Sequence, residues 1–324
     1  MILKTNVTIK KRIALTGMLV FCLLLAGIFF FAPKAKAAGN KKTMYLPVEV
    51  KEVESSEGSG KSTTMHTCSY SKNGLIKTSS TTYGYGQKDA GTSKTNYKHY
   101  KKGPLKSYMN YYRGEKSESK TFTLNKKGQI AKAQLFSYPE GKKSLLSTTT
   151  YKYNKKGILT KTVEKGSGFK EIVTYYANGN PKQRNRTETY KYSDGTTKTT
   201  GIYKYDTYGN LISLSDTTDA PGTTEDTTTT ETIKNSYNKL GDLVKAVSKS
   251  TDTYYDEGKK VKSTTKTVET RKYSYTKFGK ISKCVSTNEV TIDGTVSTTK
   301  STTTYKYKKF KVPKKLVPYA GEQD

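Results

Sequence analysis

Tryptophan is absent from this 324-residue chain, and histidine and cysteine are scarce, with two and three residues. His66 and His99 lie far apart in the sequence, and there is no Cys-x-x-Cys pair. The chain also lacks His-Glu-x-x-His, Gly-x-Ser-x-Gly and P-loop motifs, each of which places reacting groups at fixed spacing. We therefore expect no catalytic site, no cofactor and no Cys/His metal site. An enzyme with an unrecognised site is the minor alternative.

Hydrophobic residues are also few, at 32% of the chain with a mean hydropathy of −0.77, whereas there are 27 tyrosines. Such a composition cannot fill a thick core. Tyrosine, threonine and valine suit half-buried sheet surfaces, so a thin sheet covered by amphipathic rings is expected. Disorder is the competing interpretation of low hydrophobicity with high charge, but regularly spaced tyrosine and glycine argue against it.

Acidic residues are outnumbered by lysine and arginine, and the formal net charge is +31. This charge predicts attraction to polyanions such as wall polymers and anionic glycans of a cell wall or host surface. We do not expect nucleic acid as the primary partner. The alternative is that lysine only solubilises exposed strands and protects sheet edges.

Residues 1–37 resemble a secretory signal. Basic residues 10–12 precede an apolar run over residues 13–32, and Ala35-Lys36-Ala37 offers a signal-peptidase site after Ala37. The protein is therefore expected to be secreted or wall-associated. If the signal is not cleaved, residues 13–32 could instead anchor the chain in a membrane. The exported chain would keep only Cys68 and Cys284, and their pairing is left open.

One motif, Tyr-x-Tyr-x-x-x-Gly-x-Leu/Ile, recurs along the chain. It is clearest at residues 151–159, 203–211 and 273–281. A ninth, degenerate copy has Tyr305, Tyr307 and Pro313, with Lys311 in the glycine position. The spacing between copies varies, which indicates insertions in loops. The predicted turn glycines are Gly74, Gly103, Gly128, Gly157, Gly179, Gly209, Gly241 and Gly279.

Each copy predicts a β-hairpin. Residues i and i+2 of a strand share a face, so both tyrosines point one way and the lysine between them points the other. Asn or Asp followed by glycine forms the tight turn. The predicted fold is an all-β, antiparallel array of hairpin repeats, as a meander, ribbon or partly closed barrel. The predicted divisions are a signal at 1–37, a linker at 38–67, repeats at 68–313 and a tail at 314–324.

The stretch Tyr203-Lys-Tyr-Asp-Thr-Tyr-Gly-Asn-Leu211 resembles the YD repeat of bacterial Rhs and wall-associated proteins. Thr174-Tyr-Tyr-Ala-Asn-Gly-Asn180 is similar to MORN-variant repeats of bacterial surface proteins. The likeness covers roughly residues 68–313, although only 203–211 match closely. It implies a β-rich extracellular array that is sometimes associated with carbohydrate.

These observations predict a non-enzymatic surface protein that binds anionic or glycan polymers, or else a structural scaffold without a ligand. Tyrosines would stack on sugars while lysines hold anionic groups. The candidate binding residues are Tyr151, Tyr153, Tyr203, Tyr205, Lys126, Lys127, Lys155 and Lys156. Packing of most tyrosines between hairpins is the competing interpretation. An acidic group at Asp216, Asp219, Glu225, Asp226 and Glu231 matches no Ca²⁺ loop and is expected to be solvated.

Overall fold

The computed structural model describes residues 41–56, 60–87, 90–192, 195–219, 226–256, 259–292 and 294–320. These residues form an all-β antiparallel fold, as the period of two in the repeat predicts. The strands are β1 (Lys41–Ser56), β2 (Gly60–Tyr70), β3 (Ile76–Tyr83), β4 (Gly91–His99), β5 (Leu105–Tyr112), β6 (Glu115–Leu124), β7 (Ile130–Ser137), β8 (Ser144–Tyr153), β9 (Leu159–Gly166), β10 (Phe169–Tyr175), β11 (Pro181–Tyr192), β12 (Gly195–Tyr205), β13 (Leu211–Asp219), β14 (Thr227–Tyr237), β15 (Leu243–Asp256), β16 (Lys259–Tyr275), β17 (Ile281–Ile292) and β18 (Thr295–Pro313).

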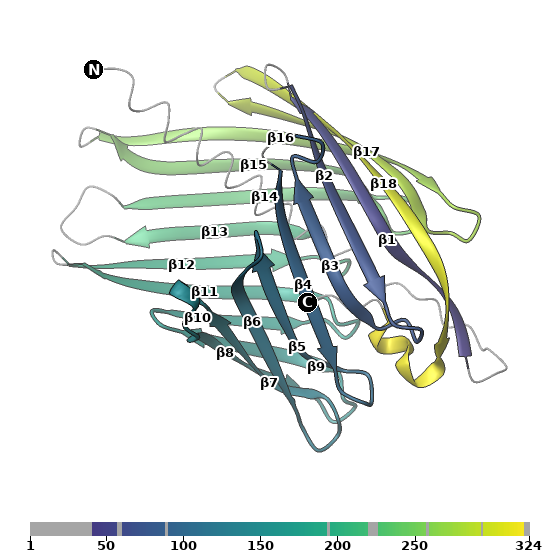
Figure 1. The fold of residues 1–324 in the computed structure, drawn as a ribbon. Coiled ribbons are helices and arrows are strands. Elements are labelled where there is room, and N and C mark those ends of the chain that lie inside the picture. The colour runs from purple at the N-terminus through teal and green to yellow at the C-terminus, as the bar shows by residue number, and fades with distance from the viewer. Residues whose placement is uncertain are drawn as a thin grey trace.

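The strands form one closed ring (Figure 1). Each strand pairs with the next in sequence, and β18 returns to pair with β1, which also pairs with β2. The sequence left a meander, a ribbon and a partly closed barrel as possible forms. The structure is a closed, 18-stranded barrel. With about 4.8 Å between strands and a strand tilt of about 40°, a circular ring of this size is roughly 36 Å across. Within the described residues, strands make extensive contacts only with the strands next to them in the ring.

The repeat motif builds the hairpins at one end of the barrel. In the turn after β8, the Asn154 N–H donates to the Ile158 carbonyl (2.9 Å) and the Gly157 N–H to the Asn154 carbonyl (3.0 Å). The Asn154 Oδ1 accepts a further bond from the Ile158 N–H. The same backbone pattern recurs at Gly74, Gly103, Gly128, Gly179, Gly209, Gly241 and Gly279, and all eight glycines have positive φ. Each of these hairpins also carries a β-bulge next to its turn, such as Thr160 beside Tyr153 and Leu159.

The ninth motif copy has no return strand of its own, and β1 supplies one. In a regular hairpin the second tyrosine pairs with the aliphatic residue after the turn, as Tyr153 pairs with Leu159. In β18, Tyr307 pairs with Pro47 of β1 across a bulge of the same kind. Residues 41–56, which fall within the predicted linker and entry segment over 38–67, therefore form a barrel strand. The segment could not be recognised because its partner lies about 250 residues away.

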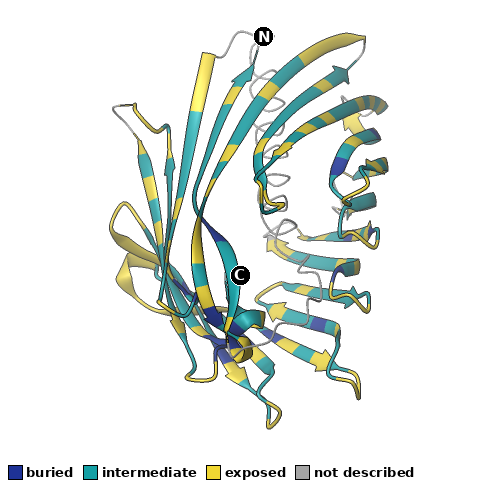
Figure 2. Cartoon of the chain, turned by 90° about the vertical axis from the view of Figure 1, so that its right-hand side faces the viewer, coloured by how far each residue is buried: buried dark blue, intermediate teal, exposed yellow. Residues whose placement is uncertain are grey.

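The buried hydrophobic residues are few and lie toward the turn end of the barrel (Figure 2): Leu105, Phe122 and Ala133 pack together on β5–β7, and a further group lies near the β1–β18 seam. Leu46, Ile76, Leu105 and Val312 are almost fully buried, and Leu316 joins them. Leu316 belongs to the 3-10 helix η3 (Lys314–Tyr319), which occupies the predicted tail. A second short 3-10 turn, η2 (Pro139–Gly141), follows β7. Burial of the tail residues fixes the chain end against the turns.

No disulfide joins Cys68 and Cys284. They lie on β2 and β17, which are separated by β1 and β18, so their strands are roughly 14 Å apart. A disulfide requires Cα atoms within about 7 Å. The predicted signal and its cleavage after Ala37 lie outside the described residues. In the described part of the chain, no helix has the length and apolar character needed to cross a bilayer.

Candidate functional site: the inner face of the barrel

The two faces of the barrel wall differ in exposure. In β14 and β16, half-buried odd-numbered residues alternate with more exposed even-numbered ones (Figure 2). The strand registers carry this alternation round the whole ring, so that each residue is assigned to the inner or outer face. Tyr151 and Tyr153 are inner residues and are half-buried, whereas Lys152 between them is outer and exposed.

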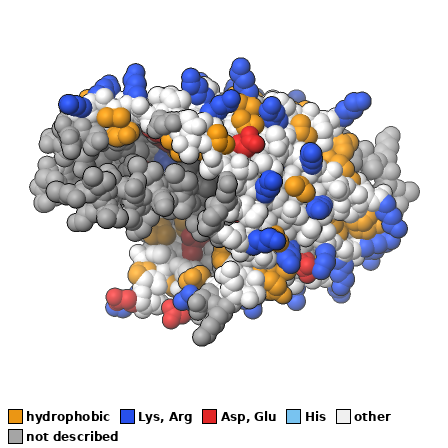
Figure 3. Space-filling view, turned by 90° about the horizontal axis from the view of Figure 1, so that it is seen from above, with side chains coloured by type: hydrophobic (Ala, Val, Ile, Leu, Met, Phe, Trp, Pro, Cys, Tyr) orange, Lys and Arg blue, Asp and Glu red, His pale blue; other side chains and the backbone are white. Residues whose placement is uncertain are grey.

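Lysine and threonine dominate the outer face, and Figure 3 shows the basic side chains projecting from the surface. The few outer acids of the described strands include Glu49, Asp219 and Glu289, and Glu49 forms an ion pair with Lys306. The outer lysines are Lys51, Lys94, Lys98, Lys132, Lys152, Lys161, Lys165, Lys170, Lys198, Lys204, Lys234, Lys245, Lys249, Lys262, Lys266, Lys272, Lys283, Lys300, Lys306 and Lys308.

The inner face instead carries most acids of the strands. Its arginines are compensated by neighbouring carboxylates: Arg184 pairs with Glu171 (2.9 Å), and Arg271 with Glu269 (2.6 Å). Lys120, opposite Tyr108, is a further inner cation, yet the inner acids of the described strands outnumber these cations, so the inner wall is negatively charged where the outer wall is positive. The inner acids are Glu52, Glu54, Glu118, Glu164, Glu171, Glu188, Asp216, Glu231, Asp252 and Glu269.

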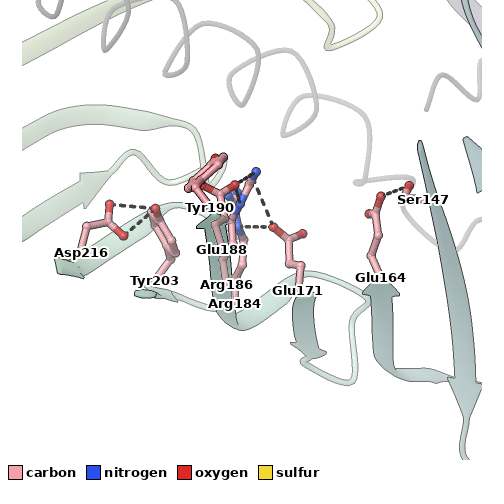
Figure 4. A network of polar contacts seen from close by, with 9 residues as sticks. All are labelled: Ser147, Glu164, Glu171, Arg184, Arg186, Glu188, Tyr190, Tyr203 and Asp216. Carbon is pink, nitrogen blue, oxygen red and sulfur yellow. Dashed lines mark hydrogen bonds and ion pairs between the residues drawn. The ribbon is translucent and has the colours of Figure 1, made fainter. Parts of the chain in front are cut away.

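Several inner acids lie in one line across the wall, which we call the carboxylate row. Successive cross-strand partners from β8 to β15 are Thr149, Glu164, Glu171, Arg186, Gly201, Asp216, Thr229 and Asp252. Figure 4 shows the central members of this row and their neighbours pointing to the same side of the sheet. The sequence distributes these residues over about 100 positions, and only the register brings them together.

Neutral hydroxyl groups donate hydrogen bonds to three of the four acids in the carboxylate row. The Ser147 hydroxyl donates to Glu164 (2.5 Å) and the Thr229 hydroxyl to Asp252 (2.6 Å). The Tyr203 phenol donates to Asp216, at 2.8 Å from each carboxylate oxygen. Elsewhere on the inner face, Ser301 donates to Glu52 and Tyr108 to Glu118. Hydroxyl groups orient these carboxylates but do not neutralise their charge.

Arg184 and Arg186 are the cations beside the row. The Arg184 guanidinium bonds Glu171 and lies 4.6 Å from the centre of the Tyr203 ring. Arg186 bonds Glu188, whose other oxygen accepts a bond from the Tyr190 phenol (2.9 Å). The Arg186 guanidinium also lies 5.5 Å from the centre of the Phe169 ring, so each arginine is held between a carboxylate and an aromatic ring. Figure 4 shows the contacts that link Glu171, both arginines, Glu188 and Tyr190, with the Tyr203–Asp216 and Ser147–Glu164 pairs on either side of them.

Gly201 makes room for the centre of the row. A Cβ at this position would lie 2.3 Å from Asp216 Oδ1 and 2.7 Å from Cε2 of Tyr203. These distances are below any real Cβ contact, so a side chain here would displace the Tyr203–Asp216 pair. The backbone of Gly201 is otherwise ordinary strand, so its role is to leave space rather than to adopt positive φ.

Burial raises the pKa of Asp216 above its usual range, although the Tyr203 hydrogen bond and the two arginines oppose the rise. Burial likewise raises the pKa of Glu52. The phenol of Tyr203 also has a raised pKa because it is buried and bonded to Asp216. Glu164 and Glu171 lie directly opposite each other, an arrangement in which like charges repel. The inner wall therefore carries negative charge at some cost to its own stability.

The candidate residues from the sequence do not form one surface. Tyr151, Tyr153, Tyr203 and Tyr205 lie on the inner face, where Tyr153 donates to the Ile130 carbonyl and Tyr203 to Asp216. The turn lysines Lys126, Lys127, Lys155 and Lys156 are exposed at the end of the barrel. As the strand alternation predicts, Lys152 lies on the opposite side of the wall from Tyr151 and Tyr153, and the turn lysines lie apart from both at the barrel end, so no joint tyrosine–lysine surface forms.

The histidines and the acidic group also have defined places. His99 bonds the carbonyls of Gly103 and Ile76, in keeping with its tyrosine position in the repeat. His66 contacts Thr81, and burial lowers its pKa. Asp216 and Glu231 lie on the inner face, while Glu225 lies outside the described residues. Within the described residues, no group of His, Cys, Asp and Glu is arranged to hold a metal ion.

No protein-family model and no curated protein matches the chain. Among solved structures, a porin-like protein from Bacteroides uniformis is similar over 81% of this chain and 98% of its own, with 12% identity and a TM-score of 0.40. Pseudomonas putida OprB covers 82% and 92%, with 9% identity and a TM-score of 0.35. Pseudomonas aeruginosa OccK10 covers 84% and 99%, with 7% identity and a TM-score of 0.34. Scores this low carry no argument about the activity of this chain.

The predicted membership of the YD, Rhs or MORN-variant families is wrong: no family model matches the chain, and its strands close into one 18-stranded ring. The predicted secreted protein that binds polymers through tyrosine and lysine, and the scaffold alternative, are corrected with it. Wall or host-surface polymers are not retained as partners. The prediction that only residues 13–32 would contact a membrane is not retained either. The closed ring and the separation of tyrosine from lysine are the physical reasons.

Proposed function

We propose that this chain is a non-enzymatic conduit that admits cationic solutes or cationic polymer segments into the lumen of its barrel. The observation that carries the proposal is the separation of charge across one wall, with acids inside and lysines outside. Charge of one sign inside low-dielectric walls concentrates ions of the other sign. Rings of acidic side chains give cation selectivity in pores by the same mechanism.

The carboxylate row supports this choice of guest. Glu164, Asp216 and Asp252 are bonded to hydroxyl groups rather than to their own cations. An entering ammonium or guanidinium group would supply these three acids with a cationic partner. Inner tyrosines such as Tyr151 and Tyr175 add aromatic faces that favour cations.

The proposal concerns the lumen and does not depend on insertion of the wall into a bilayer. A lysine on the lipid side of a transmembrane barrel costs about 2–4 kcal/mol at the bilayer midplane. The outer face carries lysine on most strands, for example Lys262, Lys266 and Lys272 on β16 alone. The outer lysines therefore do not bear on the proposal, which rests on the acidic inner wall alone.

The test compares two variants with equal loss of charge. The inner variant combines Asp216→Asn, Glu231→Gln and Asp252→Asn. The outer variant combines Glu49→Gln, Asp219→Asn and Glu289→Gln. Binding of a fluorescent oligolysine is measured by anisotropy over a salt series, with an oligoglutamate of equal length as the anionic probe.

We expect the inner variant to bind oligolysine roughly tenfold more weakly, because three lumen charges are lost. The outer variant should stay within about twofold of the wild type, since its charges face away from the guest. Equal weakening in both variants would show that binding follows net charge and not the lumen. Tighter binding of the anionic probe to a site in the lumen would contradict the proposal directly.

A further inference from the structure

The two ends of the barrel differ in charge. The eight repeat turns, the start of β1 and the end of β18 lie at one end, which we call the turn end. The hairpins that join odd-numbered strands to the next even-numbered strands lie at the other, which we call the tip end. The exposed lysines of the turn end are Lys41, Lys72, Lys101, Lys102, Lys126, Lys127, Lys155, Lys156, Lys239, Lys277, Lys280, Lys309, Lys311, Lys314 and Lys315.

Acids are scarce at the turn end. All eight turns lie within the described residues, and their acids are Asp206 and Asp242. Asp206 accepts bonds from the N–H groups of Tyr208 (2.9 Å) and Asn210 (3.0 Å), and Asp242 accepts one from the Tyr275 phenol (2.6 Å). These acids are oriented by neutral donors of the turns and strands, so the lysines beside them keep a large excess of positive charge.

Contacts between neighbouring turns hold this end in order. The Gln129 Nε2 donates to the Gly157 carbonyl of the next turn (2.9 Å). The Asn178 Nδ2 likewise donates to the Thr207 carbonyl of the turn that follows it (2.7 Å). The turn lysines are therefore presented on an ordered rim and not on independent loops.

The inner acids lie toward the opposite end of the barrel. Glu164 and Glu171 are close to the tip that joins β9 to β10. Glu269 is an exception among the inner acids, and it is ion-paired with Arg271 (2.6 Å). The inner acids that lie in the half of their strands nearer the tip end are Glu52, Glu54, Glu118, Glu164, Glu171, Glu188, Asp216, Glu231 and Asp252.

Tyrosines of the motif occupy the inner face between the acids and the turns. Their phenols bond to neighbouring strands, as Tyr153 does to the Ile130 carbonyl (2.8 Å), so this belt is neutral. The stretch from Gly157 to Glu164 spans roughly 20 Å at about 3.3 Å per residue. That separation is more than twice the Debye length of about 8 Å at physiological salt. The turn lysines and the inner acids therefore act on a guest separately.

We propose that cationic guests reach the inner acids from the tip end alone, and that the turn lysines exclude them from the turn end. The inference rests on the proposed function and adds a direction to it. A cation that approaches the turn end meets like charge, which lowers the rate of productive encounter there. At the tip end it meets residues of both signs, such as Arg113 and Glu115 on one tip, and the inner acids lie just beyond them.

The same polarity along the barrel axis limits how far a guest advances. A cationic polymer segment that enters at the tip end gains partners as far as the carboxylate row. Beyond the row it would leave the acids, cross the tyrosine belt and approach the turn lysines. Its leading end therefore stops at the belt, and entry and exit use the same end of the barrel.

The experiment covers one end of the barrel at a time. In a background with Cys22, Cys68 and Cys284 replaced by serine, a single thiol is introduced by Gln87→Cys at the tip end or by Thr207→Cys at the turn end, both of which are exposed positions. The thiol is biotinylated and bound by streptavidin, whose bulk covers that end of the ring. The association rate of a fluorescent oligolysine is then measured by stopped-flow anisotropy.

We expect the cap at the tip end to slow association roughly tenfold, whereas the cap at the turn end should change the rate by less than about twofold. Equal slowing by both caps, or stronger slowing by the cap at the turn end, overturns the inference while leaving binding in the lumen intact. Absence of oligolysine binding to the uncapped protein is a separate result, which refutes the proposed function and this inference with it.

Charge variants test whether the turn lysines are the barrier. Both variants are made in the protein that is capped at the tip end. The turn variant combines Lys126→Gln, Lys127→Gln, Lys155→Gln and Lys156→Gln. The matched control removes the same charge from the outer wall by Lys245→Gln, Lys249→Gln, Lys262→Gln and Lys266→Gln.

We expect the turn variant to associate with oligolysine at least roughly threefold faster than its capped parent, because the turn end then admits cations. The gain should shrink as salt is raised, since exposed charges are screened. The outer control should associate as slowly as the capped parent. No gain in the turn variant, or an equal gain in both, would show that the turn lysines do not govern entry and would overturn the inference.

Discussion

The Tyr70 phenol donates a 2.8 Å hydrogen bond to the carbonyl oxygen of Pro47, which joins the first motif copy to the N-terminal strand. The same bond links consecutive repeats elsewhere: Tyr153 donates to Ile130, and Tyr307 to Ile281. In those pairs the acceptor is the aliphatic residue after the preceding turn. Pro47 therefore occupies the aliphatic position of a repeat, which identifies β1 as the return strand of the ninth copy.

The turn glycines are expected to fall into two classes when replaced by alanine. Gly128 has φ of 79° and open space around its Cβ position, so Gly128→Ala should cost about 1 kcal/mol from backbone strain alone. At Gly103 the Cβ would lie 2.3 Å from the Tyr319 ring, and at Gly74 it would lie 2.6 Å from Val312. Those two variants should each lose roughly 1–3 kcal/mol more because of overpacking.

Urea unfolding of the three variants measures this difference. Gly279→Ala is the matched control, since its φ is 75° and its Cβ position is also open. Equal costs at Gly74, Gly103 and Gly128 would show that η3 and β18 do not pack on the turns as described.

The η3 segment should stabilise the seam through one side chain. Leu316 is buried against the turn at Gly103, so Leu316→Ala should lower the free energy of unfolding by roughly 2–4 kcal/mol. Val317→Ala, at a half-buried neighbouring position, should cost clearly less. Thermal unfolding by circular dichroism separates the two, and similar losses would contradict a specific role for Leu316.

The sequence was informative about local structure and uninformative about closure. The Tyr-x-Tyr spacing and the turn glycines follow from contacts within a few residues, so the antiparallel hairpins could be predicted from them. The ring could not, because the bonds that close it, such as Ser301 to Glu52, connect residues about 250 positions apart. The row of inner acids was missed for the same reason, and Asp216 and Glu231, which were expected to be solvated, lie on the inner face. These acids share alternate positions along their strands. That alternation places Glu164 and Asp216 on the same face only when the pairing register of the strands is known.

Asp216 should make the barrel more sensitive to rising pH. Burial raises its pKa in the folded state, so over the interval just above its usual value the folded chain retains a proton that the unfolded chain has lost. Its contribution to stability is thus present at low pH and is lost as pH rises through the folded pKa. Asp216→Asn should become progressively more stable relative to the wild type across that interval. Urea unfolding between pH 3 and pH 7 measures the difference.

Asp219→Asn removes a carboxylate from an exposed position on the same strand and controls for the loss of one negative charge. A stability difference between Asp216→Asn and the wild type that stays constant with pH would show that the Tyr203–Asp216 pair is solvated and that the row is not buried as described.

The assignment of β1 to the ninth repeat predicts that the chain can be permuted. A permutant that begins at Gly60, runs to residue 324 and continues through a flexible linker into residues 41–56 keeps every strand pair of the ring. It should give the same circular dichroism spectrum as residues 41–324, and its free energy of unfolding should lie within about 2 kcal/mol, because only connections change. Deleting residues 41–56 without replacing them leaves the edges of β2 and β18 open, and these should aggregate. If instead the truncated chain stayed monomeric and equally stable, β18 would have to close on β2 directly, and the Tyr70–Pro47 bond would have no part in holding the ring shut.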